Sequence, residues 1–295
     1  MMRIALFVLT NLAVLIVAYI ALGILGVDSV LKENGVDMDL GNLLVLSAVF
    51  GMAGSFVSLM LSKWMALRST RARKITEPRG EMEGWLLETV RQQAKAAGIG
   101  MPEVAIFDSQ TPNAFATGAK RNNALVAVST GLLSTMKRDE VEAVLGHEIS
   151  HVANGDMITL TLIQGVVNTF VIFLSRIIGH FVDRVVFKTE RGYGPAYWIT
   201  SIIAQIVFGI LASTVVFWFS RRREFRADIG GAKLAGAASM IGALERLKSG
   251  VGGESLPKDM AALGISATGK KTIARMFSTH PPLEERIERL KRAQY

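Results

Sequence analysis

Four long apolar runs constrain this chain more than any other feature of its sequence. They cover Ile4–Ile24, Leu43–Leu61, Met157–Ile178 and Pro195–Phe219. A helix needs ~20 consecutive apolar residues to cross the hydrocarbon core of a bilayer, and each run is close to that length. Hydrophobic residues make up 50% of the 295 residues, and the excess is concentrated in these runs. The sequence therefore predicts an α-helical membrane protein with four transmembrane helices.

The first run has a second interpretation, a cleaved signal peptide. Such a peptide has an apolar core of only ~7–15 residues behind a basic start. Here Arg3 is the only charged side chain before a longer run, which favours an uncleaved helix.

The basic residues indicate how the chain is oriented. Six of them follow the second run, Lys63, Arg68, Arg71, Arg73, Lys74 and Arg79, and three arginines at 221–223 follow the fourth. Lys and Arg are enriched on the cytoplasmic side of membrane proteins. Two runs separate the basic blocks, so parity and charge agree. Both blocks and both termini are expected in the cytoplasm, and the acidic segment 27–41, expected to be a short polar loop, faces the other compartment.

This orientation divides the chain into four parts. We expect a first transmembrane hairpin at 1–62 and a cytoplasmic block at 63–156. A second hairpin follows at 157–220, and a second cytoplasmic block at 221–295. The net charge of +8 is then a topology signal rather than a nucleic-acid surface, and we expect no nucleic acid as a partner.

The stretch 146–151 reads Gly-His-Glu-Ile-Ser-His, within a helical pattern that we expect to cover 139–153. His147 and His151 lie one turn apart on the same helix face, so both rings can reach one metal ion. Glu148 lies beside that face, where it can reach a water molecule. Such a helix is typical of zinc peptidase sites. Because the chain has no cysteine, zinc would have to be held by His and carboxylate groups.

A third ligand is predicted directly after the triple arginine. Glu224 and Asp228 are four residues apart and share a helix face. A site with two His and one Glu needs one carboxylate from a second helix, and a further carboxylate can orient a ligating ring. We assign these roles to Glu224 as ligand and Asp228 as partner of His147 or His151. The alternative is that Glu224 is a solvated charge beside a membrane anchor.

Short strands are expected upstream of this helix, at 103–107, 113–118 and 124–129, after an amphipathic helix at 81–97. An exposed strand can pair with an extended substrate through main-chain hydrogen bonds. The same pattern is equally typical of a plain structural hairpin.

The chain resembles the HtpX family of bacterial membrane zinc metalloproteases, relatives of the CAAX prenyl proteases. The resemblance covers essentially the whole chain and rests on the four-run layout and on motifs in family order. These motifs are Asn113–Gly118, His147–His151, Asn154–Asp156, Glu224–Asp228 and Thr279–Pro282. One departure is Lys137-Arg138, where relatives often have Ser-Pro, which predicts a weaker helix cap.

The resemblance implies a cytoplasmic, gluzincin-like α+β metalloprotease domain with a small sheet. It implies one Zn²⁺ per chain, bound by His147, His151 and Glu224, with Glu148 as the catalytic residue. It also implies an edge strand lining the substrate groove, with the contacts made by Asn113, Ala114, Phe115 and Ala116.

Two features near the C-terminus are less determined. His280 is either a donor lining the cleft or a turn residue fixed by Pro281-Pro282. The charged stretch 284–292 is expected to be a solvated helix. The Ala- and Gly-rich segment 230–243 is expected to let helices pack closely behind the metal.

We therefore expect a zinc endopeptidase of the bacterial inner membrane. Its substrates would be polypeptides, including misfolded and membrane proteins, cleaved at the cytoplasmic face. The resemblance implies a role in quality control and stress response. Processing of one dedicated client is a second possibility. A non-catalytic membrane scaffold is a third, and the intact set of His, Glu and Asp residues argues against it.

Overall fold

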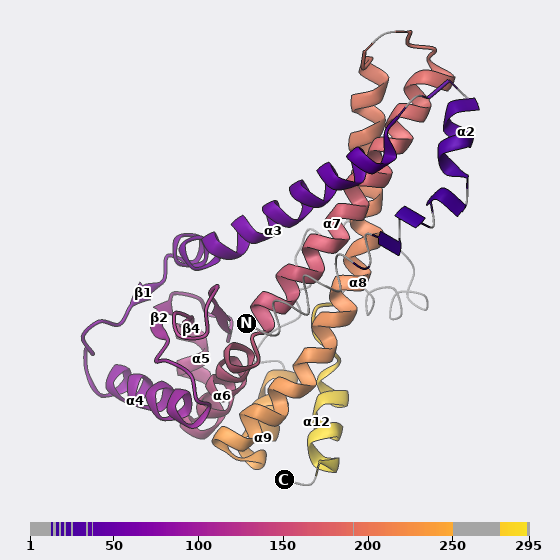
Figure 1. The fold of residues 1–295 in the computed structure, drawn as a ribbon. Helices are drawn as coiled ribbons and strands as arrows, with labels where there is room; N and C mark the ends of the chain where they lie inside the picture. The colour runs from indigo at the N-terminus through magenta and orange to yellow at the C-terminus, as the bar shows by residue number, and fades with distance from the viewer. Residues whose placement is uncertain are drawn as a thin grey trace. The chain divides into compact units, whose positions relative to one another are not determined.

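The computed structural model describes residues 38–190, 192–249 and 278–293, together with part of 13–36 (Figure 1). The chain forms two compact units. One, here the helical unit, comprises Met1–Val57 and Thr161–Val216. The other, here the sheet unit, comprises Ser58–Leu160 and Phe217–Tyr295. Each unit is thus built from two separate stretches of sequence.

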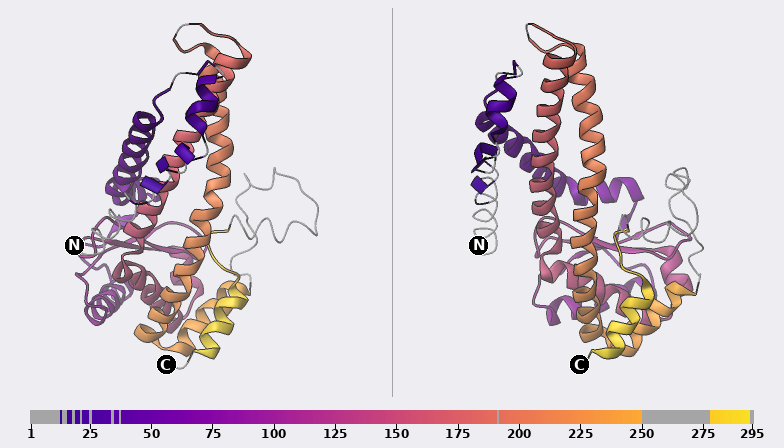
Figure 2. Two further views of the ribbon diagram at one scale, coloured as in Figure 1. Left: turned by 45° about the vertical axis from the view of Figure 1, so that its right-hand side comes forward. Right: turned by 90° about the vertical axis from the view of Figure 1, so that its right-hand side faces the viewer.

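Three helices of the described residues are long and apolar enough to cross a membrane. They contain the second, third and fourth runs: α3 (Leu40–Thr70), α7 (Asp156–Phe181, continued by the π-helical turn η1, Val182–Val186) and α8 (Pro195–Ala235). In the helical unit, α7 and α8 run side by side (Figure 2). The predicted first span, Ile4–Ile24, lies largely outside the described residues.

The expectation of a short polar loop at 27–41 is wrong in its first half. Helix α2 covers Val27–Glu33. Lys32 Nζ lies 2.8 Å from Asp28 Oδ2, one helical turn away, and Leu31 is buried. An opposite-charge pair at this spacing and one apolar anchor favour a helical turn over a loop.

The sheet unit contains four strands in the order β1-β2-β4-β3. The predicted strands are confirmed as β2 (Glu103–Phe107), β3 (Ala114–Thr117) and β4 (Leu125–Ser129). Strands β2 and β4 pair in parallel, whereas β3 pairs antiparallel to β4 and forms an edge among the described strands.

Strand β1 (Arg73–Lys74) was not predicted, because its basic residues were interpreted only as a topology signal. It pairs antiparallel with β2. Lys74 Nζ and Lys63 Nζ each lie 2.7 Å from a carboxylate oxygen of Glu103. Two of the basic residues are therefore also used to hold the sheet together.

Alternating side chains of the sheet face two separate cores. On one face the sheet packs against α4 (Glu81–Ala96) and α6 (Arg138–Asn154). This core includes Leu86, Val90, Val104, Val126, Val128, Leu145 and Ile149, all buried. The opposite face, with Ala105, Phe107, Leu125 and Ala127, packs against the last turns of α3.

Helix α6 has well-defined ends. The Glu140 side chain accepts a hydrogen bond from the Lys137 backbone N–H at 2.9 Å, so the N-terminus is capped despite the unfavourable Lys137-Arg138 start. The predicted stop is confirmed at Gly155, whose φ of 69° is left-handed. Helix α7 begins at the next residue, Asp156.

The remaining helices of the sheet unit are α5 (Thr130–Thr135), α9 (Ala237–Lys248) and α12 (Leu283–Arg292). Helices α9 and α12 lie side by side (Figure 2), joined by a cluster that includes Met240, Leu244, Ile287 and Leu290. The expectation of a solvated helix at 284–292 is wrong for one face, on which Arg286, Ile287 and Leu290 are buried.

Leu145→Ala tests the core that holds α6 on the sheet. Leu145 is fully buried, and removing its side chain should lower the free energy of unfolding by ~2–5 kcal/mol. Met101→Ala is a matched control at a residue 40% exposed, with an expected change within ~0.5 kcal/mol. Denaturant unfolding of the full chain in detergent measures both. Equal effects of the two substitutions would contradict the assigned core.

Candidate active site

Helices α6 and α8 approach closely because both carry glycine where they meet. A Cβ on Gly230 would lie 2.2 Å from Ser150 Oγ, and one on Gly231 would lie 3.0 Å from the His147 backbone nitrogen. A Cβ on Gly146 would meet the Gly231 backbone at 3.3 Å. Close packing behind the site, predicted for 230–243, is confirmed at these two glycines of α8. It brings Glu224, on α8, to the histidines of α6.

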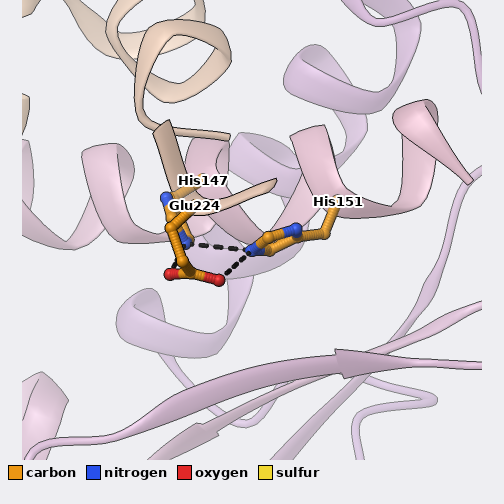
Figure 3. A group of neighbouring side chains, drawn as sticks. All are labelled: His147, His151 and Glu224. Carbon is orange, nitrogen blue, oxygen red and sulfur yellow. Dashed lines mark hydrogen bonds and ion pairs between the residues drawn. The ribbon is translucent and has the colours of Figure 1, made fainter. Parts of the chain in front are cut away.

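The three predicted ligands come together (Figure 3). One ligand atom from each of His147, His151 and Glu224 lies within 4.8 Å of the others. His147 Nε2 and His151 Nε2 are 3.1 Å apart. They lie 3.5 Å from Glu224 Oε2 and 3.3 Å from Glu224 Oε1, respectively. The arrangement could hold one metal ion.

A second carboxylate contacts each ring from behind. His147 Nδ1 lies 2.9 Å from Asp228 Oδ1, and His151 Nδ1 lies 2.7 Å from Asp156 Oδ2. Engaging Nδ1 fixes each ring so that Nε2 faces Glu224, which is how outer carboxylates orient ligating histidines. Asp228 contacts His147, one of the two partners predicted for it. Asp156 was predicted only as a helix cap, although its place five residues after His151, just past the helix stop, was a usable signal.

Three buried acids make this site strongly favourable for positive charge. Burial lowers the pKa of His151, but hydrogen bonds to Asp156 and Glu224 outweigh it and raise the pKa to about 10. Burial also lowers the pKa of His147, and its contacts with Asp228 and Glu224 raise it above the ordinary value. Without a metal ion, the rings would hold protons in its place.

The donor set fits a bound metal ion. Glu224 Oε2 is buried and accepts no hydrogen bond from the described residues. A buried carboxylate oxygen in that condition is costly unless a cation neutralises it. Two imidazole nitrogens and one carboxylate are a common ligand set for catalytic zinc.

Two buried arginines complete the surroundings of the site. Arg286 on α12 donates to both carboxylate oxygens of Asp228, at 2.8 and 2.5 Å. Arg223 on α8 donates from Nη1 to the Asp156 carbonyl at 2.7 Å. Both were missed: Arg223 was interpreted as a topology signal, and Arg286 as part of a solvated helix.

A cavity of about 790 Å³ opens beside the histidines. His147, Glu148 and His280 line it together with Asn113 and Ala114 at the start of β3. The rest of its wall is largely apolar and includes Leu132, Val144, Met240, Leu244, Leu247 and Leu283. The predicted base and part of the predicted substrate strand thus share one cavity.

Three predicted contact residues lie differently from one another. His280 is 60% exposed, with Nε2 3.5 Å from Glu224 Oε2. Phe115 packs on Phe107, with ring centroids 5.6 Å apart, on the sheet face opposite α6. Ala116 packs on the α6 side but does not line the cavity. Successive strand residues point to opposite faces, so one strand cannot direct all four predicted side chains to the groove.

Asp156→Ala tests whether the carboxylate behind His151 orients that ring. We expect metal affinity to fall about 10–100-fold, because the ring loses the partner that fixes it. Asp139→Ala, an exposed acid in the first turn of the same helix, should leave affinity unchanged. Competition with a chelator of known affinity measures both. Unchanged affinity in Asp156→Ala would exclude the assigned role.

Comparison with known proteins agrees with this geometry. Residues 81–294 match the model of Peptidase family M48. Protease HtpX of Thioalkalivibrio sulfidiphilus is 61% identical over 294 residues, which cover 100% of both chains. Protease HtpX homolog of Nitrosomonas europaea is 62% identical over 293 residues, 99% of this chain and 100% of the relative.

The crystal structure of S. mikatae Ste24p is also similar, with a TM-score of 0.62 at 18% identity. The match covers 84% of this chain and 58% of that one, and at this identity it shows a shared fold. The family resemblance noted in the motifs is confirmed by the matches to HtpX proteases. The chain belongs to Peptidase family M48, and within it to the HtpX-type membrane metalloproteases.

Proposed function

We propose that this protein is a zinc endopeptidase of the bacterial inner membrane. It cleaves misfolded or membrane polypeptides at the cytoplasmic face, in proteolytic quality control and stress response. The observation that carries this proposal is the convergence of His147, His151 and Glu224 within 4.8 Å, beside a cavity that Glu148 lines.

The metal would be held by His147 Nε2, His151 Nε2 and one oxygen of Glu224. When bound there, zinc supplies a Lewis acid that polarises the scissile carbonyl and makes water a stronger acid. Asp156 and Asp228 hold the two rings in the orientation that leaves Nε2 free for this task.

Glu148 is the general base. It follows His147 on α6, is half-buried and lines the cavity. Its carboxylate takes a proton from the attacking water and passes that proton to the nitrogen of the leaving amine. The position next to a ligand, but off the ligand face of the helix, lets it reach water without competing for the metal.

The substrate binds as an extended strand. Strand β3 is at an edge of the sheet among the described strands, and it starts at the cavity wall where Asn113 and Ala114 lie. Main-chain groups of an edge strand pair with any polypeptide, so this mode suits substrates of varied sequence. Asn113 and Ala114 line the groove with side chain and backbone, whereas Phe115 and Ala116 contribute through the backbone.

His280 is a donor to the oxygen that becomes negative as the carbonyl is attacked. Its ring lines the cavity beside Glu224 and is open to solvent, so it can contact a substrate group. Donors aimed at developing negative charge stabilise the transition state. Its role as a turn residue before Pro281-Pro282 is compatible with this one.

The orientation follows from charge and parity. The basic stretches at 63–79 and 221–223 flank apolar runs and mark the cytoplasmic side. Both stretches belong to the sheet unit, which would lie with both termini in the cytoplasm. A dedicated client would require a groove that selects side chains closely. Pairing through an edge strand favours broad cleavage, and the complete set of His, Glu and Asp residues opposes a non-catalytic scaffold.

Two substitutions separate metal binding from catalysis. Glu148→Gln should retain bound metal and lose ~10²–10⁴-fold in kcat, because the amide cannot accept the proton. Glu224→Ala should lose bound metal and, with it, activity. Metal analysis and cleavage of unfolded casein by each purified variant provide the two measurements. Parental cleavage by Glu148→Gln would refute the base, and full metal content in Glu224→Ala would refute the ligand.

A substrate panel tests the biological role. Purified protein in detergent is incubated with unfolded casein, its folded counterparts and a set of membrane proteins, with and without chelator. Broad, chelator-sensitive cleavage of unfolded chains is expected. A single cut in a single protein would support a dedicated client instead, and no cleavage would support a scaffold.

A further inference from the structure

The two histidines of the site are oriented by carboxylates of very different origin. Asp156, behind His151, is five residues away in sequence. Asp228, behind His147, lies on another helix and is itself held by Arg286, which is 139 residues from His147. Half of the site therefore depends on the C-terminal end of the described chain.

Arg286 is placed to fix Asp228 rather than only to neutralise it. Its Nε and Nη2 donate to the two oxygens of Asp228, 2.8 and 2.5 Å away, which is the two-pronged geometry that a lysine cannot make. Asp228 Oδ1, one of these oxygens, also contacts His147 Nδ1 at 2.9 Å. Arg286 Nη1 lies 3.6 Å from Glu224 Oε2, so the guanidinium contacts both acids on α8.

The arginine reaches this position only because α12 is docked. Its side chain is 7% exposed, and the neighbouring Ile287 and Leu290 are buried against α9. Arg289 lies over the Phe225 ring, 3.7 Å from its centroid, which adds a contact to α8 next to Glu224. By contrast, Arg292 near the end of the helix is 79% exposed and pairs only with Glu288.

Resting on the proposed role of His147 as a metal ligand, we propose that Arg286 is a positioning residue for the metal site. Its guanidinium fixes Asp228, and Asp228 fixes the His147 ring, when α12 is docked on α9. The metal site is therefore completed by docking of the C-terminal helix, which also carries His280 into place through the rigid Pro281-Pro282 connection.

The test compares Arg286→Met with Arg292→Met in the full-length protein in detergent. Metal affinity is measured by chelator competition, and the geometry of the site by the visible absorption spectrum of bound Co²⁺. Arg286→Met should weaken metal binding about 10–100-fold and alter the Co²⁺ spectrum. Arg292→Met should change neither. The thermal unfolding midpoint of each variant reports folding separately.

A double substitution shows whether Arg286 acts through Asp228. In an Asp228→Asn background, Arg286→Met should weaken metal binding by no more than about twofold further, because residues that act as one unit are not additive. Losses that multiply would overturn the pathway through Asp228. Should Arg286→Met fail to fold, Arg286→Lys keeps the charge but not the fork and should still alter the Co²⁺ spectrum.

His147→Ala separates this inference from the proposed function. If His147→Ala binds metal as the parent does, the ligand assignment itself is wrong. If His147→Ala loses metal while folded Arg286→Met binds it like the parent with an unchanged Co²⁺ spectrum, only the positioning role is overturned.

Discussion

Helices α6 and α8 meet almost backbone to backbone at Gly146 and Gly231, and the site depends on that contact. Any side chain at Gly230 or Gly231 would collide with Ser150 or with the backbone at His147. A wider separation would carry Glu224 and Asp228 away from the histidines together, since both acids lie on α8. One packing constraint thus sets the distance of a ligand and of a supporting carboxylate at the same time.

The charges around the site are balanced by burial rather than by exposure. Asp156, Glu224 and Asp228 are nearly inaccessible to solvent, and so is Arg286. Isolated buried charges are costly, and each must be paired or bind a metal ion. Asp228 is satisfied by Arg286 and His147, and Asp156 by His151. Glu224 is left with one buried oxygen that accepts no hydrogen bond from the described residues, which is where a cation would be most stabilising.

Local patterns in the sequence predicted much of this site. The spacing of His147 and His151, the helix stop at Gly155 and the alternation in 103–107 and 124–129 are all set by neighbours along the chain. The third member, Glu224, was accessible because the apolar runs fixed which face the chain returns to. The role of Arg286 was not accessible, because a charged helix of this composition is typical of a solvated surface. Only tertiary packing on α9 buries one of its arginines. Strand β1 was missed for a related reason: pairing with Glu103 is non-local, and two residues carry too little pattern.

Helix α7 starts with Asp156, and α8 runs without a break from Pro195 through Asp228 to Ala235. The predicted part boundaries, between 156 and 157 and between 220 and 221, therefore fall inside continuous helices. A cut at the first would leave Asp156, the partner of His151, as a frayed chain end. A cut at the second would start a helix three residues before Glu224 and remove Ser220, to which Arg223 donates. A water-soluble fragment with an intact site would have to retain the adjoining turns of both helices, apolar surface included.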